Sequence, residues 1–372
     1  MRTFLLIALP LFALFNAVTL WHLWRVHSRR RPFVVALAVI GNLMWLFLPL
    51  LNARTDFSRV VRAILGPPWF AWLAFVLMDS IFIALVALAW LAFSRRRPFP
   101  HFARWPSRVF LGLILAGSIV GCYQALVPLR VEMVPVAIRN LPPSLENYRI
   151  ALLADLHVGL FTRPSRLRKI FGTTSSLRPN VAIVAGDLID DDPYFVPKLL
   201  DGARNLDSSI PLFAVLGNHE MYGAPDEVIA RLNRSRIRLL VNEGAPAGGV
   251  WLAGLSDYAA REPRLRPDMQ HALSGAPSGS IPIVVSHQPK SFDEARRRGI
   301  PLTLVGHTHG GQCGFRPLHV SLAGLFLPYH MGLYERGPSK LCVNTGTGFW
   351  LLPFRLGMTP EITLLELRRA QP

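Results

Sequence analysis

Aspartate, asparagine and histidine residues recur directly after short apolar segments in the C-terminal part of this chain. They are Asp155, His157, Asp187, Asn218, His219, His287, His307 and His309. Each follows a run rich in Val, Ile and Leu, which predicts a buried strand. In open α/β sheets, ligands bind at the edge formed by the carboxyl ends of the strands. We therefore expect these side chains to converge on one site.

The residue types in this set indicate metal chemistry. Carboxylate, amide and imidazole groups suit divalent ions such as Mn, Fe or Zn, and the absence of cysteine argues against a structural zinc site. The set is too large for one ion, whereas two ions about 3.5–4 Å apart can share a carboxylate and hold both oxygens of a phosphoryl displacement. The spacing of Asp155 and His157 places both side chains on one side of an extended segment. The sequence therefore predicts two divalent metal ions, whose identity it leaves open.

The elements that must position these residues begin at about Tyr148. From there, short β-rich runs alternate with polar stretches of helical character, which is typical of an α/β layer structure. The expected strands are Arg149–Ala154, Val181–Ala185, Leu212–Leu216, Val250–Gly254, Ile283–Ser286, Leu302–Val305, Leu341–Asn344 and Glu361–Leu367. We assign residues 131–147 to a linker or entering strand and residues 148–372 to the α/β domain.

The first 130 residues have a different character. Only 17% of the residues in the chain are charged and 51% are hydrophobic, whereas about a quarter of the residues in soluble proteins are charged. The apolar stretches Thr3–Trp24, Phe33–Leu51, Trp69–Phe93 and Arg108–Pro128 are each near the length that spans a bilayer. Residues 1–130 are thus predicted to form an all-α transmembrane region of four helices.

The basic residues of this region lie mostly between the apolar stretches. Residues 1–130 hold 14 Arg, no Lys and 2 Asp. Nucleic-acid binding would place the cations on a polar folded surface, so we expect no nucleic-acid partner, and Arg clusters between apolar runs are topology signals. The more basic connections, residues 25–31 and 95–108, are predicted to be cytoplasmic, which places both termini outside. Residues 55–65 are predicted to form a short helix on the membrane surface.

Several polar residues outside the ligand set have simpler interpretations. We expect Asp79, near the middle of the third stretch, to form a polar clasp with Asn16 or Asn42, because an unpartnered carboxylate in hydrocarbon is costly. Structural roles are assigned to His22, His27, His101, His271 and His319, and a solvated turn to Asp190, Asp191 and Asp192.

Asp257 is a candidate supporting residue of the site. Arg163, Arg166, Arg168 and Lys169 form either a solvated helix face or a contact with lipid phosphates. Cys313 and Cys342 can form a disulfide only if the fold brings them together.

The ligand set, in this order, resembles the calcineurin-like metallophosphoesterase superfamily over roughly Tyr148 to Leu367. The motifs are Asp155-x-His157, Gly186-Asp187, Gly217-Asn218-His219-Glu220, His287 and Gly306-His307-x-His309. The continuation Gly310-Gly311-Gln312 and the late Pro353-Phe354-Arg355 are similar to the bacterial membrane-associated branch of that superfamily. The resemblance implies a two-sheet sandwich flanked by helices.

The resemblance also implies a role for each residue. Asp155, His157 and His309 would hold the first metal, and Asn218, His287 and His307 the second. Asp187 would bridge them. His219 would act without ligating a metal, by donating a proton or stabilising the transition state, while a metal-bridging hydroxide attacks phosphorus.

Two apolar segments, Leu325–Tyr329 and Phe349–Phe354, lie close in sequence to the metal motifs. They are either core or, if exposed together, a patch that contacts membrane or ligand. His330 and Arg355 are weaker candidates for substrate binding.

We therefore predict a multi-pass protein of the bacterial inner or plasma membrane with an extracytoplasmic phosphohydrolase domain. Its expected substrate is a phosphoester or pyrophosphate of a lipid or envelope component, and the lipid bilayer is its expected partner. The alternatives are a hydrolase of soluble phosphodiesters or nucleotides, and a membrane sensor or scaffold without catalysis. The sequence does not indicate an oligomeric state.

Overall fold

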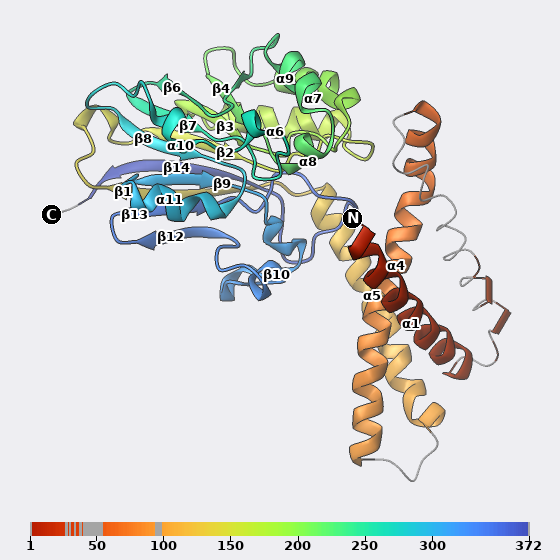
Figure 1. Ribbon diagram of the computed structural model, residues 1–372. Coiled ribbons are helices and arrows are strands. Elements are labelled where there is room, and N and C mark those ends of the chain that lie inside the picture. The colour runs from red at the N-terminus through yellow and green to blue at the C-terminus, as the bar shows by residue number, and fades with distance from the viewer. Residues whose placement is uncertain are drawn as a thin grey trace. The chain divides into compact units, whose positions relative to one another are not determined.

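A computed structural model describes residues 2–26, 55–93 and 99–370, together with residues 29, 31, 32, 35, 36 and 39 (Figure 1). Within these residues the chain divides into two compact units, Met1–Ile119 and Val120–Pro372. The first unit is helical. The second is the α/β domain, preceded by the last turns of a helix that begins in the first unit.

The helical region contains α1 (Arg2–Val26), α4 (Asp56–Phe93) and α5 (Phe99–Leu126). Residues Phe57–Phe93 and Phe102–Leu126 are long and apolar enough to cross a membrane, with mean hydropathies of 2.3 and 1.9. Both helices begin earlier than predicted. The segment expected to form a separate surface helix continues into α4 through Pro67 and Pro68, although a proline inside a helix removes a backbone hydrogen bond. The predicted span over residues 33–51 lies almost wholly outside the described residues.

A buried polar network joins all three of these helices. The carboxylate oxygens of Asp79 lie 2.9 and 3.0 Å from Nδ1 of His22. Nε2 of the same ring lies 2.8 Å from Oγ of Ser107, which donates to the Ala103 carbonyl. The predicted clasp therefore exists, but its partner is His22 rather than the expected asparagines: Asn42 is outside the described residues, and the bonds described for Asp79 go to the imidazole. The structural role expected of His22 is confirmed.

The first sheet of the α/β domain has the strand order β1-β14-β2-β3-β4-β5. Its strands are β1 (Arg130–Ile138), β2 (Arg149–Leu153), β3 (Val181–Ala185), β4 (Leu212–Val215), β5 (Arg238–Leu239) and β14 (Glu361–Arg369). The pairing is parallel except between β14 and β2. Helices α6 (Pro164–Ser176), α7 (Val196–Ala203) and α9 (Pro225–Leu232) cover its outer face with residues such as Phe171, Leu199 and Leu232.

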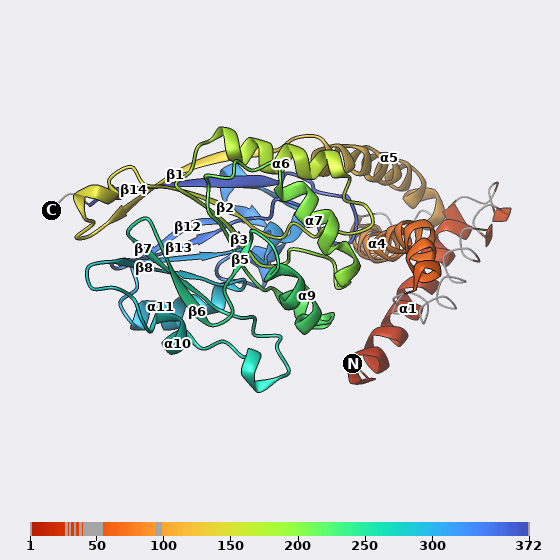
Figure 2. The ribbon, with the colours of Figure 1, turned by 90° about the horizontal axis from the view of Figure 1, so that it is seen from above.

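The second sheet has the order β12-β13-β9-β8-β7-β6. Its strands are β6 (Glu243–Ala247), β7 (Val250–Gly254), β8 (Ile281–Val285), β9 (Leu302–Val305), β12 (Gly332–Arg336) and β13 (Ser339–Val343), and α10 (Met269–Leu273) and α11 (Phe292–Arg297) pack on it. Figure 2 shows the two sheets as stacked layers with helices outside them. Apolar side chains of both sheets, including Leu152, Ile183, Leu252 and Ile283, form the shared core.

This architecture confirms the expected two-sheet α/β domain and every strand predicted for it. The sequence missed β5, β6 and β12, which are short or partly exposed edge strands, and the hairpin of β10 (Gly314–Phe315) and β11 (Val320–Ser321). Such strands lack the continuous apolar run by which buried strands are recognised. Parallel pairing of β2 with β3, and of β8 with β9, brings the carboxyl ends of these strands to common edges.

Candidate metal centre

The backbone at the strand ends is held in an unusual conformation. Asp155, His157, Asp187, His307 and His309 all have positive φ angles, between 43° and 74°. Non-glycine residues adopt this left-handed region at a cost of about 1–2 kcal/mol each, so the surrounding contacts must compensate. The N–H of His307 donates to both carboxylate oxygens of Asp155 at 3.1 Å, and the N–H of Asp155 donates to the Gly186 carbonyl at 3.0 Å. These bonds connect the ends of β2, β3 and β9.

Two glycines make this crowding possible. A Cβ atom on Gly186, which has a φ of 84°, would lie 2.5 Å from the ring of His287. A Cβ on Gly217 would lie 2.1 Å from a carboxylate oxygen of Asp187. The glycines that precede the ligands therefore allow one strand end to approach the next.

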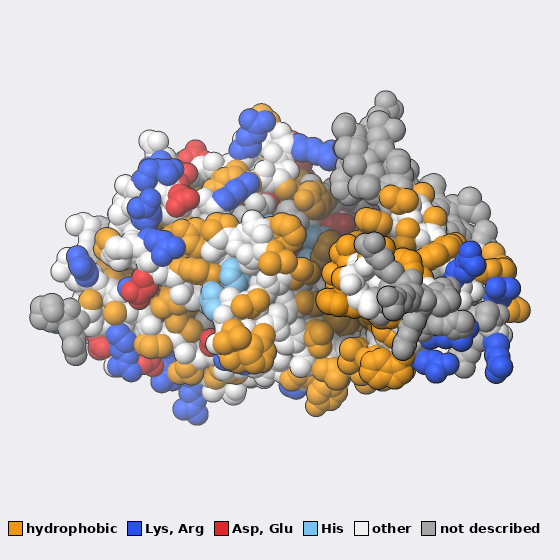
Figure 3. All heavy atoms as spheres, turned by 90° about the horizontal axis from the view of Figure 1, so that it is seen from below, with side chains coloured by type: hydrophobic (Ala, Val, Ile, Leu, Met, Phe, Trp, Pro, Cys, Tyr) orange, Lys and Arg blue, Asp and Glu red, His pale blue; other side chains and the backbone are white. Residues whose placement is uncertain are grey.

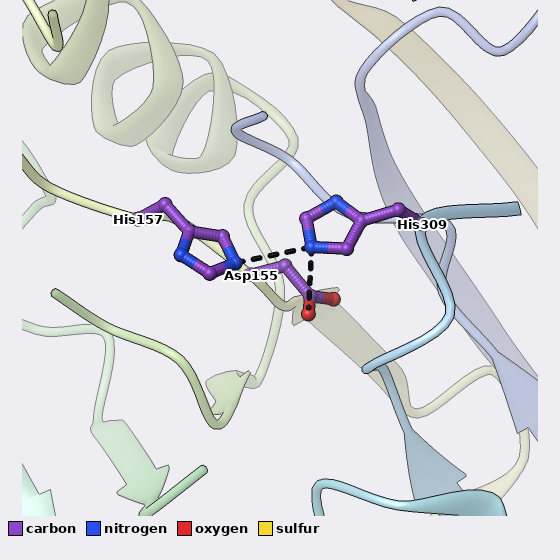
Figure 4. Close-up of side chains that lie close together, drawn as sticks. All are labelled: Asp155, His157 and His309. Carbon is purple, nitrogen blue, oxygen red and sulfur yellow. Dashed lines mark hydrogen bonds and ion pairs between the residues drawn. The ribbon is translucent and has the colours of Figure 1, made fainter. Parts of the chain in front are cut away.

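The first cluster consists of Asp155, His157 and His309, all buried. Nε2 of His309 lies 3.0 Å from Nε2 of His157 and 3.4 Å from Oδ1 of Asp155. Figure 4 shows the two imidazole rings and the carboxylate directed into one small space. Two imidazole nitrogens and a carboxylate oxygen are ligands that suit divalent ions such as Mn, Fe or Zn.

The second cluster is centred on His287. Its Nε2 lies 3.1 Å from Oδ2 of Asp187, 3.1 Å from Oδ1 of Asn218 and 3.2 Å from Nδ1 of His307. Oδ2 of Asp187 also lies 3.5 Å from Nε2 of His157 in the first cluster. Asp187 thus touches both clusters, which is the position that a bridging carboxylate requires. The buried His/Asp clusters are consistent with a dinuclear metal site.

The buried charges strongly perturb one another. Burial raises the pKa of Asp155 to about 6, although neighbouring imidazoles oppose the shift. Burial would also raise the pKa of Asp187, but His287 and His157 hold it well below its usual value. For His307, burial and the adjacent His287 lower the pKa to about 4. The imidazole is then neutral at pH 7, which is the form that ligates metals.

His219 lies beside the ligand clusters, and its donor atom is within 4.8 Å of donor atoms of His157 and Asp187. Its backbone N–H donates to Asp187 at 3.0 Å, and its ring centroid is 4.6 Å from that of His157. Nδ1 is 2.7 Å from a carboxylate oxygen of Asp191. Burial favours neutral His219, yet the Asp191 and Asp187 carboxylates raise its pKa to about 9. A charged imidazole beside the ligand clusters is equipped to donate a proton.

Sequence reasoning missed the groups that orient these imidazoles. Asp190 Oδ1 lies 2.8 Å from Nδ1 of His157, and Arg355 Nη2 lies 3.0 Å from Nδ1 of His309. The ring of His287 is held by Nδ1, 2.8 Å from the Ala185 carbonyl. The Asp190 carboxylate and the Ala185 carbonyl can accept the second ring N–H of a metal-binding histidine and so fix its ring orientation, whereas the Arg355 guanidinium can only donate. Asp190 and Asp191 are half-exposed, as the expected solvated turn requires, but each carboxylate also faces an imidazole. The expectation is wrong for Asp192, which is buried and accepts a hydrogen bond from the Tyr194 N–H.

The candidates for substrate binding, His330 and Arg355, are both buried, and the candidate supporting residue is Asp257. The ring of His330 is buried against Ser321 and His319, with Nδ1 3.0 Å from the Ser321 hydroxyl. Arg355 is fully buried, so its guanidinium supports His309 rather than facing open solvent. Asp257 accepts two hydrogen bonds from Gln288, the residue after His287, as expected of a supporting residue. Cys313 and Cys342 are both free.

Comparisons with known proteins agree with this geometry. Residues 148–311 match the family model described as calcineurin-like phosphoesterase. A Helicobacter pylori (strain J99) protein described as an uncharacterized metallophosphoesterase is 32% identical over 278 residues, which cover 74% of this chain and 72% of that protein. A zebrafish (Danio rerio) transmembrane protein with a metallophosphoesterase domain is 33% identical, over 70% of this chain and 62% of that protein. The chain therefore belongs to the calcineurin-like phosphoesterase family and is a metal-dependent phosphoesterase.

Proposed function

We propose that this protein is a membrane-anchored dinuclear phosphoesterase that hydrolyses a phosphoester or pyrophosphate of a lipid or envelope component. The observation that carries the proposal is the contact of Asp187 with both ligand clusters. In this assignment Asp155, His157 and His309 hold one ion. Asn218, His287 and His307 hold the other, and Asp187 is shared.

The chemistry divides between the ions and the protein. Two bound divalent ions supply Lewis acidity and lower the pKa of water. The protein residues position the ions and the substrate. Asp190 and the Ala185 carbonyl orient the imidazoles of His157 and His287, and the left-handed strand ends hold the donor atoms in place. His219 donates a proton to the leaving oxygen, with Asp191 keeping its ring charged and oriented.

Membrane anchoring is supported by two long apolar helices and by relatives described as transmembrane proteins. We propose four spans over residues 1–130, with both termini and the catalytic domain outside the cytoplasm. The Arg-rich connections at residues 25–31 and 95–108 support this orientation, since cytoplasmic loops carry an excess of Arg and Lys. An extracytoplasmic site would reach lipids of the outer leaflet and envelope phosphates, and cytoplasmic nucleotides would be out of reach.

We expect the Asp187→Asn variant to lose paired metal binding, because the substitution removes the charge that both clusters share. Elemental analysis of purified full-length protein should show fewer than two ions per chain, whereas Asp201→Asn, an exposed carboxylate of α7, should match the parent protein. Two ions per chain in Asp187→Asn would show that this carboxylate does not bridge.

His219→Ala should keep both metals but lose turnover by about 10²–10⁴-fold, the range typical of a general acid–base group. The loss should be largest for substrates with poor leaving groups, since these need the proton most. His271→Ala, at an exposed histidine, is the matched control. Near-normal turnover of an alkyl phosphoester by His219→Ala would exclude the assigned role.

Substrate class is tested by assaying the full-length protein with Mn²⁺ against phospholipids, lipid pyrophosphates, nucleotides and an aryl phosphodiester. We expect the aryl ester to be hydrolysed, because its phenolate is a good leaving group. We expect the lipid substrates to be hydrolysed faster than the nucleotides. Preference for nucleotides would favour the soluble-substrate alternative. Metal binding without any hydrolysis would favour the sensor or scaffold.

Topology is tested by fusing alkaline phosphatase after Pro372. This reporter folds only after export, so the proposed orientation predicts an active fusion. A fluorescent cytoplasmic reporter at the same position should remain dark. The opposite pair of results would reverse the orientation and favour a substrate in the inner leaflet.

A further inference from the structure

A band of exposed apolar side chains lies in the two segments that follow the last metal motif. We call it the apolar rim: Phe315, Leu318, Val320, Leu322, Leu325, Phe326, Trp350 and Leu351. Phe326 is 80% exposed and Leu318 71%. Figure 3, a view from below Figure 1, shows hydrophobic side chains in several groups separated by white and charged atoms. Contiguous exposed patches of this kind mark interaction surfaces.

Hydrogen bonds hold the two segments of the rim together. The side chain of Gln312 donates to the Trp350 carbonyl at 3.1 Å and accepts from its N–H at 2.8 Å. The N–H of Gly314 donates to the Leu356 carbonyl at 2.9 Å, and that of Leu322 to the Cys313 carbonyl at 2.8 Å. The two segments of the rim are therefore linked to each other and form one surface.

The rim offers little charge to a partner. No Asp or Glu occurs between Gly314 and Gly332 or between Thr345 and Pro360. The cation Arg316 is turned inward, 2.6 Å from Glu132, and Arg355 is fully buried. A surface so composed fits an apolar occupant.

The last turns of α5 identify that occupant. Residues Val120–Leu126 belong to the same compact unit as the rim, and α5 is one of the two helices long and apolar enough to cross a membrane. The N–H of Arg355 donates to the Gly121 carbonyl at 3.0 Å, and that of Gly357 to Oε1 of Gln124 at 2.7 Å. A Cβ on Gly121 would lie 2.3 Å from the Phe354 ring. The segment that carries Trp350 and Leu351 thus packs on the end of α5.

Cations gather where this helix ends. Lys169 Nζ donates to the Val127 carbonyl at 2.8 Å, and Arg166 Nη1 to that of Pro128 at 2.9 Å. Arg163 and Arg168 of the same cluster are exposed. Basic side chains beside a membrane-crossing helix attract anionic lipid headgroups, which is the lipid alternative that the sequence left open.

We propose that the apolar rim inserts into the lipid bilayer that α5 crosses, so that the catalytic domain works while docked on the membrane surface. Trp350 connects the rim to the site, since its ring centroid is 6.2 Å from that of His219. A lipid phosphate could then reach the clusters without leaving the bilayer. Docking itself does not depend on the identity of the substrate; the kinetic consequence below rests on the proposed lipid substrate.

Docking is tested in the full-length protein reconstituted in phosphatidylcholine–phosphatidylglycerol vesicles, with the photo-crosslinker p-benzoylphenylalanine at Phe326. The expected product is a crosslink to lipid. The same amino acid at Arg234, an exposed residue two positions after the end of α9, should give none, since Figure 1 shows α9 across the sandwich from β10. A crosslink from position 326 to a second copy of the chain, or no crosslink at all, would overturn the proposal.

A second variant tests the consequence for catalysis. Leu325→Asp/Phe326→Asp should keep its metals and its rate on a soluble aryl phosphodiester. Its rate on vesicle-borne lipid substrate should fall at least about tenfold, because the transfer of each large apolar side chain out of water is lost. Equal rates of this variant and its parent on lipid would overturn docking. Absence of lipid hydrolysis by the parent, with lipid crosslinking intact, would contradict the proposed substrate alone.

Discussion

The burial of two carboxylates, Asp155 and Asp187, is the constraint on which the rest of this domain depends. Negative charge removed from water is costly unless it is paired and hydrogen-bonded. The structure meets this requirement with imidazoles and backbone N–H groups contributed by several strand ends. The left-handed backbone and the glycines beside it follow from the need to bring that many donors together. In a metal-dependent phosphoesterase, divalent cations supply the remaining positive charge.

The side chains that converge on this site could be found in the sequence because each is a metal-binding residue type placed directly after a buried strand. Buried strands such as β3 and β9 read as continuous apolar runs, and the polar residue that follows each run marks the functional edge. The two-sheet arrangement itself came from the family resemblance, since apolar runs do not specify which strands pair. Edge strands such as β12 escaped because their side chains are only partly buried.

The orienting groups were harder to predict for a physical reason. A run of three aspartates predicts a solvated turn, and Asp190 and Asp191 are indeed 39% and 50% exposed. Only the fold shows that each also faces an imidazole. Arg355 lies 46 residues from His309 in sequence. The contact of Asp79 with His22 was missed for a related reason. Sequence position gives the depth of a side chain in a helix bundle, but the rotation of each helix decides which side chains face the interior.

The network of His22, Asp79 and Ser107 has a consequence for the biosynthesis of the protein. His22 lies on α1, Asp79 on α4 and Ser107 on α5, and the ribosome makes these helices in that order. The helix that carries the carboxylate is thus made after the helix that carries the imidazole. An isolated Asp at the centre of a membrane helix opposes insertion by about 2.5–3.5 kcal/mol. When α4 emerges, α1 is already available, and its imidazole can meet the carboxylate during insertion. In the proposed membrane anchor, α4 would therefore insert more readily with α1 beside it.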